Sequence, residues 1–389
     1  MPNATAIVPR ACPGPRGIGR NPQFAPTTLL AEGNESSAAI AKDGGLVVVH
    51  AQAGALGITR IDALGRLVPT RPFASARAAT WAPIDKPVWG TSPSLARDVD
   101  GTLYAAWSDD GIVLATSRDG GTWSAPRTID PCTRCRPQVV VGGGAVHVVF
   151  ESDGLRLRTS RDRGTTFGAP ATIASGAGRA LVAADGRVHV AAIAGSPLGA
   201  YGSANQHVQY ASARPVTVSL RDERVPYYFS NPSVAFDPRR KWLYVAYVRG
   251  GRDGIWDLVI AASRNGGATW TRTRIGDEPA CALHAVPNLA VDAATGTLHL
   301  AWYDTRGETA RFAHATCATG LARGCLERGR INDVAFARLE TVRHASSWIG
   351  DSETLLVDER RRVLHAIWAQ PVADGTTRVF HAKAKLPLR

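Results

Sequence analysis

Arginine, carboxylate and aromatic side chains gather in short polar stretches that follow apolar runs of the sequence. The densest stretches are Tyr303-Asp304-Thr305-Arg306 and Trp348-Ile349-Gly350-Asp351. Arg136 and Arg249 lie in two other stretches, so three arginines (136, 249 and 306) can converge on one anion, because a guanidinium pairs bidentately with a carboxylate. For any single residue the alternative is a loop salt bridge or a turn cap.

The element that must position these residues is first visible as a turn. Ser160 to Phe167 carries a serine, an aspartate two residues on, and a glycine two residues beyond that. The aspartate can accept hydrogen bonds from nearby backbone amides, the glycine can take a positive φ, and the final aromatic anchors the next strand. Residues 117–123 and 263–270 are two further versions, the second with asparagine in the aspartate position. Three such turns indicate a repeat protein.

A second pattern, glycine followed by alternating apolar and aromatic or histidine residues, is typical of a strand. Its copies lie at residues 101–107, 144–150, 186–192, 241–247, 296–302 and 362–368, with a degenerate seventh at 45–50. Another short strand precedes most copies, often directly after a proline such as Pro93 or Pro232. A third strand, the serine-aspartate turn and a fourth strand follow.

Each unit therefore predicts a four-stranded antiparallel blade, and seven units predict an all-β β-propeller. Six blades are the alternative, if the unit around Gly45 or His189 is an elaboration. The last unit, residues 351–388, runs out of chain before its fourth strand. We expect residues 24–31 to supply that outer strand and close the ring, since an open ring would expose a strand edge. The predicted domains are an irregular lead-in, residues 1–23, and one propeller, residues 24–389.

The turns join third and fourth strands, so they occupy one face of the ring. The loops from second to third strand, and from one blade to the next, meet on the other face around the central channel. All the polar stretches described above belong to those loops. We therefore expect functional groups on the second face.

With these turns on blades of this kind, the chain resembles the sialidase superfamily of Asp-box (BNR-repeat) propellers over nearly all of residues 24–388. The resemblance implies three arginines that clamp a substrate carboxylate, a tyrosine nucleophile activated by a glutamate, and an aspartate acid/base. The family's N-terminal Arg-Ile-Pro is absent; Arg136-Pro137 and Arg224-Val225-Pro226 are similar but lie in other blades. The superfamily also contains binding propellers without catalysis.

The resulting hypothesis is a sialidase-like propeller that recognises an acidic glycan at the central channel and, as an enzyme, would hydrolyse it. The alternative is a non-catalytic scaffold that binds protein or polysaccharide. The candidate catalytic residues are Tyr303, Asp304, Glu151, Asp109 and Asp351. The candidate substrate-binding residues are Arg136, Arg249, Arg306 and Trp348. We expect no metal or cofactor, and a monomer.

Composition and cysteines narrow the partners and the compartment. The formal net charge is +12, but the arginines are scattered, so nucleic-acid binding is not expected. No apolar run reaches the length of a membrane span. The even count of 6 cysteines favours a secreted or periplasmic protein with disulfides, although this chain shows no signal peptide. Cys132 and Cys135 favour a local disulfide over a redox pair or a metal site, and Cys317 with Cys325 can close a small loop.

Overall fold

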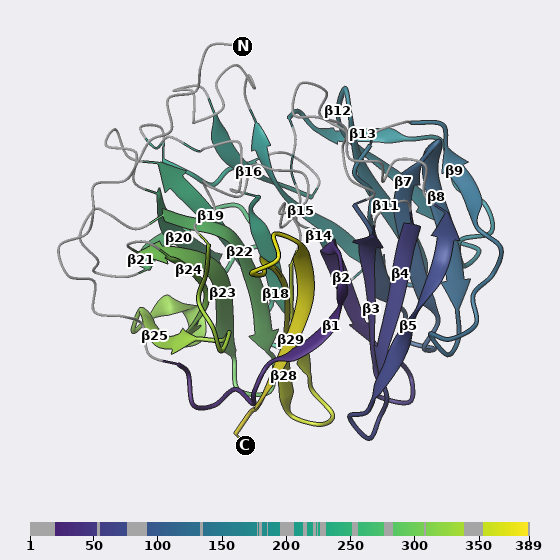
Figure 1. Cartoon of the computed structure of the whole chain (residues 1–389). Coiled ribbons are helices and arrows are strands. Elements are labelled where there is room, and N and C mark those ends of the chain that lie inside the picture. Colours follow the sequence, from purple (N-terminus) through teal and green to yellow (C-terminus); the bar gives the residue numbers. More distant parts are fainter. Residues whose placement is uncertain are drawn as a thin grey trace, which may run out of the picture.

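The chain folds into a ring of seven antiparallel blades (Figure 1). The computed structural model describes residues 20–52, 55–75, 92–132, 135–176, 178, 181–184, 186–194, 206–212, 216–220, 223, 225, 231–250, 256–275, 283–306, 309–337 and 353–387.

Blades 1 to 4 each contain four strands in chain order. Blade 1 consists of β2 (Asn34–Ile40), β3 (Leu46–Gln52), β4 (Ala55–Ile61) and β5 (Leu67–Ser75), and blade 2 of β6 (Ser94–Arg97), β7 (Leu103–Asp109), β8 (Gly111–Ser117) and β9 (Arg127–Asp130). Blade 3 consists of β10 (Gln138–Gly142), β11 (Ala145–Ser152), β12 (Gly154–Ser160) and β13 (Ala171–Ala174), and blade 4 of β14 (Leu181–Ala184), β15 (Arg187–Ala194), β16 (His207–Ala211) and β17 (Val216–Thr217).

Blades 5 to 7 follow the same plan with additions. Blade 5 consists of β18 (Ser233–Asp237), β19 (Trp242–Gly250), β20 (Trp256–Ser263) and β21 (Thr271–Ile275). Blade 6 consists of β22 (Leu283–Asp292), β23 (Thr297–Arg306), β24 (Thr309–Cys317) and β25 (Cys325–Arg330), with β26 (Phe336–Ala337) on the edge. Blade 7 consists of β27 (Thr354–Asp358), β28 (Val363–Pro371), β29 (Thr377–Lys385) and β1 (Thr28–Glu32). A 3-10 turn, Thr319–Leu321, precedes β25. A parallel β-bridge, Trp256 to Leu283, links the sheets of blades 5 and 6.

The second strand of each blade is buried on both faces, which is why it is apolar almost without interruption. In β7, every residue from Leu103 to Ser108 is buried. The outer strand β9 instead exposes Arg127 and Thr128. Burial thus decreases from the second strand to the outer strand, which explains why the second strands gave the clearest pattern in the sequence.

The core consists of apolar clusters between successive blades. Val49 of blade 1 and Trp107 of blade 2 share one cluster, and Trp302 and Trp368 of blades 6 and 7 share another. Leu46 of blade 1 belongs to a cluster with Ile367 of blade 7, so the packing continues around the whole ring. Each blade is therefore stabilised by its two neighbours.

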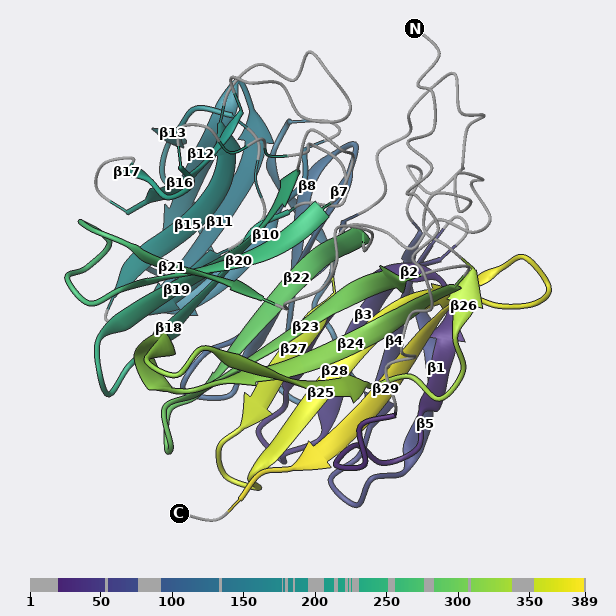
Figure 2. The ribbon, with the colours of Figure 1, turned by 90° about the vertical axis from the view of Figure 1, so that its left-hand side faces the viewer.

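The N-terminal strand closes the ring, as the sequence predicted. β1 pairs with β29 in antiparallel register, with Thr28 opposite His381, and Phe24 adds an isolated bridge to Ala384. Figures 1 and 2 both show β1, in purple, beside the yellow strands of blade 7. The prediction of seven blades closed by an N-terminal strand is confirmed, and the six-bladed alternative is wrong.

The three serine-containing turns join third to fourth strands, where the sequence placed them. In the turn of blade 3, the Ser160 hydroxyl donates to Asp162 at 2.7 Å and accepts the Gly164 N–H at 2.7 Å. Blade 5 repeats the second contact at 2.9 Å between Gly267 N–H and Ser263 Oγ. These turns share one face of the ring, which we call the turn face, with the turns between first and second strands.

Among the described residues, no helix is long and apolar enough to cross a membrane. Cys132–Cys135 and Cys317–Cys325 both form the disulfides that the sequence suggested. Most of the predicted lead-in, residues 1–23, lies outside the described residues; within it, the backbone N–H of Asn21 donates to the Arg330 carbonyl at 2.8 Å.

Candidate functional site

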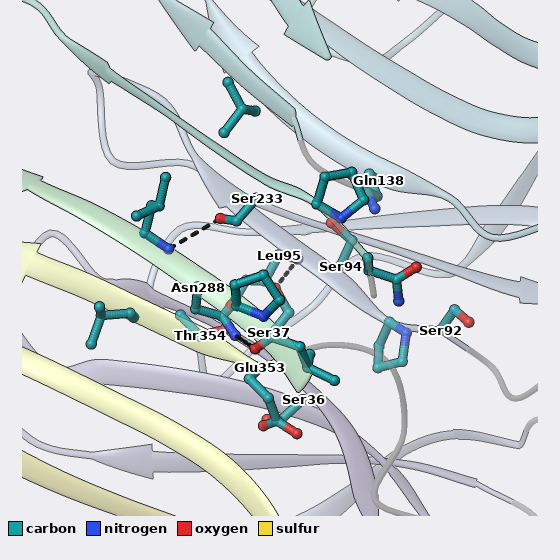
Figure 3. Close-up of a pocket in the computed structure, with 18 of the residues that line it drawn as sticks. Ser36, Ser37, Ser92, Ser94, Leu95, Gln138, Ser233, Asn288, Glu353 and Thr354 are labelled. Atoms are coloured by element: carbon teal, nitrogen blue, oxygen red, sulfur yellow. Dashed lines mark hydrogen bonds between the residues drawn. The ribbon is translucent and has the colours of Figure 1, made fainter. Parts of the chain in front are cut away.

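A cavity of about 250 Å³ opens where the first strands of the blades begin, on the face opposite the turn face (Figure 3). We call this the channel face. Described residues of six blades, blades 1 to 3 and 5 to 7, contribute to the lining. Pro93, Pro137 and Pro232 lie at the mouth, directly before first strands, as the sequence predicted. Pro287 also lines the cavity, but the prediction that it precedes its strand is wrong: it lies inside β22, where the pairing register shifts between Ala285 and Asn288.

Small uncharged polar side chains form a ring in this cavity, which we call the polar ring. Each member pairs with the next-to-last residue of the second-strand pattern in its own blade, for example Ser94 with Ala106. The other blades place their members at the same register position. The members are Ser37, Ser94, Gln138, Ser233, Asn288 and Thr354.

Three serines of the polar ring connect neighbouring blades. The backbone N–H of Leu95 donates to Ser37 Oγ at 3.0 Å, that of Val139 to Ser94 Oγ at 3.0 Å, and that of Leu289 to Ser233 Oγ at 3.1 Å. Each hydroxyl is thereby held in place by the next blade. Since a hydroxyl both donates and accepts, each retains a proton that it can donate.

Glu353 is the only charged residue among the described residues of the lining. Its carboxylate accepts the Tyr303 hydroxyl at 2.5 Å and the Ala369 backbone N–H at 3.1 Å. The tyrosine comes from blade 6 and the glutamate from blade 7, so the pair also joins two blades. Glu353 and Ser36 both line the cavity and are labelled in Figure 3.

Tyr303 itself is fully buried, with Phe312 and Phe336 at ring-centroid distances of 5.1 Å and 5.9 Å. Burial, and then the charge of Glu353, raises the pKa of the Tyr303 hydroxyl well above its usual value. The hydroxyl therefore keeps its proton at neutral pH and acts as a donor to Glu353. Its predicted catalytic role stays a prediction.

Asp304 and His284 are paired on adjacent strands of blade 6. Asp304 is fully buried, and one of its carboxylate oxygens lies 3.9 Å from His284 Nε2. His284 also meets Trp302 edge to face, with ring centroids 5.9 Å apart. Asp304 is next to Tyr303 in sequence but, like Tyr303, does not line the cavity.

Asp109 is the last residue of β7 and Glu151 the next-to-last residue of β11, so both lie on the channel face. The backbone N–H of Gly178 donates to Glu151 Oε1 at 3.2 Å, which joins blade 3 to the approach to blade 4. Asp109 lies opposite Gly111 in the hairpin of blade 2. Neither residue lines the cavity, so the structure brings the described carboxylate candidates to one face but not into one pocket.

The predicted arginine cluster is not part of the described cavity lining. Arg249 donates to one oxygen of Asp257 through Nε at 3.2 Å and Nη2 at 3.1 Å. Arg136 lies directly before Pro137 at the mouth. Arg306 ends β23, and its side chain is not described; Trp348 and Asp351 lie outside the described residues.

The sequence predicted neither the Tyr303–Glu353 pair nor a second tyrosine–glutamate pair in the structure. Glu223 accepts the Tyr247 hydroxyl at 2.7 Å and the Leu220 backbone N–H at 2.8 Å. Burial raises the pKa of Tyr247, and the Glu223 charge adds to this effect. No spacing in the sequence relates Glu223 to Tyr247. The polar ring was also missed, although the register of the predicted first strands would have aligned its members.

Within the described ranges, no group of three or more histidine, cysteine, aspartate or glutamate side chains can hold a metal ion.

Comparisons with known proteins support the fold. No protein-family profile and no curated protein matches the sequence. The structure of YCF48 bound to a D1 peptide is 12% identical, with a TM-score of 0.54, over 96% of this chain and 99% of that one. The WD40 repeats of RRP9 are 12% identical, with a TM-score of 0.53, over 92% and 95%. The Hadza microbial sialidase Hz136 is 17% identical, with a TM-score of 0.44, over 69% of this chain and 63% of the sialidase. At these identities the likeness shows the propeller fold alone, and membership of the sialidase superfamily stays a prediction.

Proposed function

We propose that the chain is a binding propeller that holds a segment of a partner protein at the channel face and carries out no catalysis. The observation that supports this is that carboxylates on the channel face accept hydrogen bonds from backbone N–H groups. Glu35 accepts the Ser92 backbone N–H at 2.9 Å, and Glu151, Glu223 and Glu353 accept backbone N–H groups in the same way. A general acid or base needs a carboxyl group that can exchange its proton with a substrate. These carboxylates instead serve the backbone.

The polar ring suits an extended peptide. A peptide backbone presents alternating N–H donors and C=O acceptors, and serine, threonine, asparagine and glutamine side chains can match both. The described lining holds no aromatic side chain for stacking on a sugar and no cation for a carboxylate. The peptide bound to YCF48 supports a peptide ligand on a propeller of this extent, through fold likeness alone. The two disulfides support a secreted or periplasmic setting.

The second candidate is a glycosidase that acts on an acidic glycan, and the Tyr303–Glu353 contact of 2.5 Å favours it. A tyrosine beside a glutamate is the nucleophile pair that the sialidase resemblance implies. In this reading the arginines 136, 249 and 306 would bind the substrate carboxylate, and Asp304, Asp109, Glu151 or Asp351 would supply the acid/base.

To distinguish the two candidate functions, the purified full chain is tested for binding on a peptide array and for turnover of fluorogenic glycosides that include sialosides and uronides. We expect peptide binding and no turnover. Gln138→Ala removes a lining amide and should weaken binding about three- to tenfold, the range for one hydrogen bond. Thr122→Ala, on the turn face, is the matched control and should leave binding unchanged.

Turnover of any glycoside that is lost in Glu353→Gln would carry the second candidate and end the first. Binding that is equally affected by Gln138→Ala and Thr122→Ala would remove the channel face as the binding site.

A further inference from the structure

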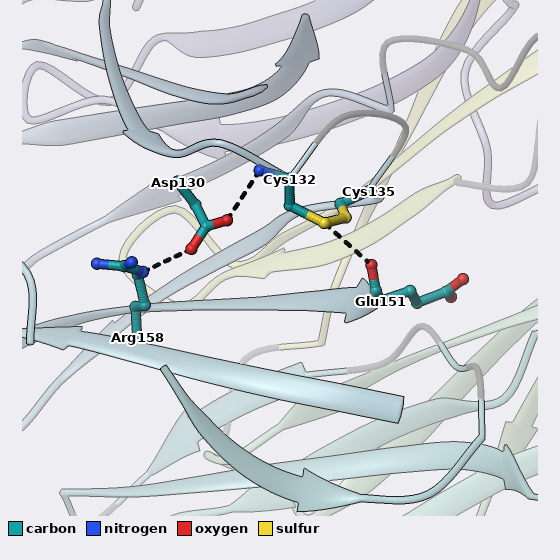
Figure 4. The surroundings of a disulfide bond; sticks show 5 residues. All are labelled: Asp130, Cys132, Cys135, Glu151 and Arg158. Carbon is teal, nitrogen blue, oxygen red and sulfur yellow. Dashed lines mark hydrogen bonds and ion pairs between the residues drawn. A yellow bond between two sulfur atoms is a disulfide. The ribbon is translucent and has the colours of Figure 1, made fainter. Parts of the chain in front are cut away.

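The Cys132–Cys135 disulfide lies on the crossover from blade 2 to blade 3 (Figure 4). β9 ends at Asp130 and β10 begins at Gln138, which belongs to the polar ring. The two Cα atoms are 5.8 Å apart. The disulfide therefore closes a small loop immediately before Pro137 and Gln138 of the cavity.

The surroundings hold Cys132 in place independently of the disulfide. Its backbone N–H donates to Asp130 at 2.9 Å, and Asp130 also accepts a hydrogen bond from Arg158 Nε at 2.7 Å. Cys132 Sγ lies 3.8 Å from the carbonyl oxygen of Glu151. That carbonyl can accept a hydrogen bond from a Cys132 thiol, so a reduced form would have a partner ready at its present position.

The two cysteines differ in burial. Cys135 is 4% exposed and packs in the apolar cluster with Val139 and Phe150. Cys132 is only partly buried and lies at the edge of the same cluster. An external thiolate therefore reaches Cys132 Sγ first, and Cys135 is the sulfur that leaves.

The second disulfide differs in its setting. Cys317 and Cys325 lie directly opposite each other on the hydrogen-bonded strands β24 and β25; Cys317 is 1% exposed, and Cys325, like Cys132, is half-buried. Their sequence separation is 8, against 3 for Cys132 and Cys135. A disulfide that closes a shorter loop removes less entropy from the unfolded chain, so Cys132–Cys135 has the smaller structural role.

We propose that Cys132–Cys135 is a thiol–disulfide exchange site for a dithiol reductant, placed so that its redox state alters the blade 2 to blade 3 side of the channel face. One thiolate of the dithiol attacks Cys132 Sγ, the Cys132–Cys135 bond breaks, and Cys135 leaves as a thiolate that takes up a proton. The second thiol of the dithiol, deprotonated, attacks its partner sulfur in the mixed disulfide. Cys132 is released and protonated, and the dithiol becomes a cyclic disulfide, so that two electrons and two protons pass to the protein.

The structural consequence follows from the crossover. With the disulfide open, Cys132 keeps its contact with Asp130 and Cys135 keeps its packing in the apolar cluster, but the covalent link across the crossover is lost. The Val139 N–H to Ser94 Oγ hydrogen bond still holds β10 to blade 2. Reduction should therefore loosen the approach to the polar ring and leave the blades folded.

The test is graded reduction of the native full chain with dithiothreitol, followed by alkylation and peptide mapping by mass spectrometry, which reads Cys12 and Cys281 separately. We expect Cys132 and Cys135 to be alkylated at a dithiothreitol concentration on the order of tenfold below that needed for Cys317 and Cys325. Hydrogen exchange of the amides between Asp130 and Val139 should accelerate on reduction, with little change in blades 6 and 7.

Two single variants test the assignment of the sulfurs. Cys135→Ser leaves Cys132, which should form a mixed disulfide with an aromatic disulfide reagent about tenfold faster than the Cys135 left in Cys132→Ser. Reduction of both disulfides at one concentration, or of Cys132–Cys135 only in denaturant, would overturn the exchange site. Faster reaction of Cys135 than of Cys132 would overturn the order of attack, and unchanged hydrogen exchange would overturn the link to the channel face. None of these outcomes depends on the ligand, so they are separate from the test of the proposed function.

Discussion

The two faces of the ring use their carboxylates differently. On the turn face, Asp98, Asp237 and Asp358 each accept a backbone N–H from three residues further along the chain. On the channel face, Glu35 and Ser92 are separated by 57 positions, and Glu353 and Tyr303 by 50. The local aspartate contact recurs in the same form in three blades, whereas Glu35 and Glu353 each bind a different kind of partner. The acidic side chains of the turn face therefore follow the repeat, whereas those of the channel face do not.

The first prediction concerns long-range contacts within blades 6 and 7, near the turn face. His299 Nδ1 lies 3.2 Å from His314 Nε2, and His365 Nδ1 lies 3.0 Å from His381 Nε2; both pairs are stacked. Burial lowers the pKa of His299 and of His365 to about 4 and that of His381 to about 3. Burial also lowers the pKa of His314 well below its usual value.

The charges facing these pairs do not reverse the effect of burial. Asp292 raises the pKa of His299, while Arg362 and Arg328 lower it. Asp358 raises the pKa of His365, while Lys383 and Arg361 lower it. The unfolded chain thus binds more protons between about pH 6.5 and 4 than the folded chain.

Stability should therefore be complete above pH 6.5 and decline as the pH falls toward 4. The expected loss is about 3 kcal/mol for each histidine whose pKa is lowered from 6.5 to about 4. Urea unfolding at a series of pH values measures it, and His299→Gln should reduce the pH dependence. A stability that stays constant over this window would show that the histidines are not desolvated as described.

The second prediction tests whether the turns also join blades. Gly267 has φ +92°, and a Cβ added there would lie 2.2 Å from the ring of Tyr210, in the preceding blade. Its neighbour Gly266 has φ +69° with open space around it. Gly267→Ala should cost about 3 kcal/mol, from backbone strain and overpacking together. Gly266→Ala should cost about 1 kcal/mol, from backbone strain alone.

Chemical unfolding of the two variants gives the difference directly. Equal losses would mean that the blade 5 turn does not press on Tyr210, and that this turn is local in its packing as well as in its hydrogen bonds.

The same distinction explains how much the sequence could predict. Strand order, blade number and the closing strand follow from patterns of two to eight residues that recur along the chain, and all three were found. The closing strand was placed at residues 24–31, whereas β1 spans Thr28–Glu32, because Phe24 makes only an isolated bridge. The boundary was inexact because side-chain alternation does not reveal where ladder pairing starts.

The channel face was harder to predict because its contacts are set by the assembled ring. The spacing of Glu353 and Tyr303 in the sequence does not predict a hydrogen bond between blades 6 and 7. Arg249 shows the opposite case: it lies opposite Asp257 in the β19–β20 hairpin, and a correct register would have predicted that ion pair. The predicted convergence of Arg136, Arg249 and Arg306 did not take the cross-strand partner of Arg249 into account.

The third prediction has the smallest effect and separates the two faces most directly. Asp162 accepts the Thr166 backbone N–H at 2.8 Å, the Thr166 hydroxyl at 2.5 Å and the Ser160 hydroxyl at 2.7 Å. These hydrogen bonds, the Thr166 hydroxyl first, hold the pKa of Asp162 far below its usual value. Asp162→Ala should lower the melting temperature by about 2–4 °C and leave binding at the channel face unchanged.

Asp162→Asn is the matched control, since Asn265 fills the same place in blade 5 and accepts the Thr269 N–H at 2.9 Å. The asparagine variant should therefore melt close to the wild type, because its side-chain oxygen can accept the same backbone hydrogen bond. Calorimetry and the peptide-binding assay, run on both variants, measure the two quantities independently. A large loss of binding in folded Asp162→Ala would mean that the turn face reaches the ligand, and the division of the ring into a structural and a functional face would then fail.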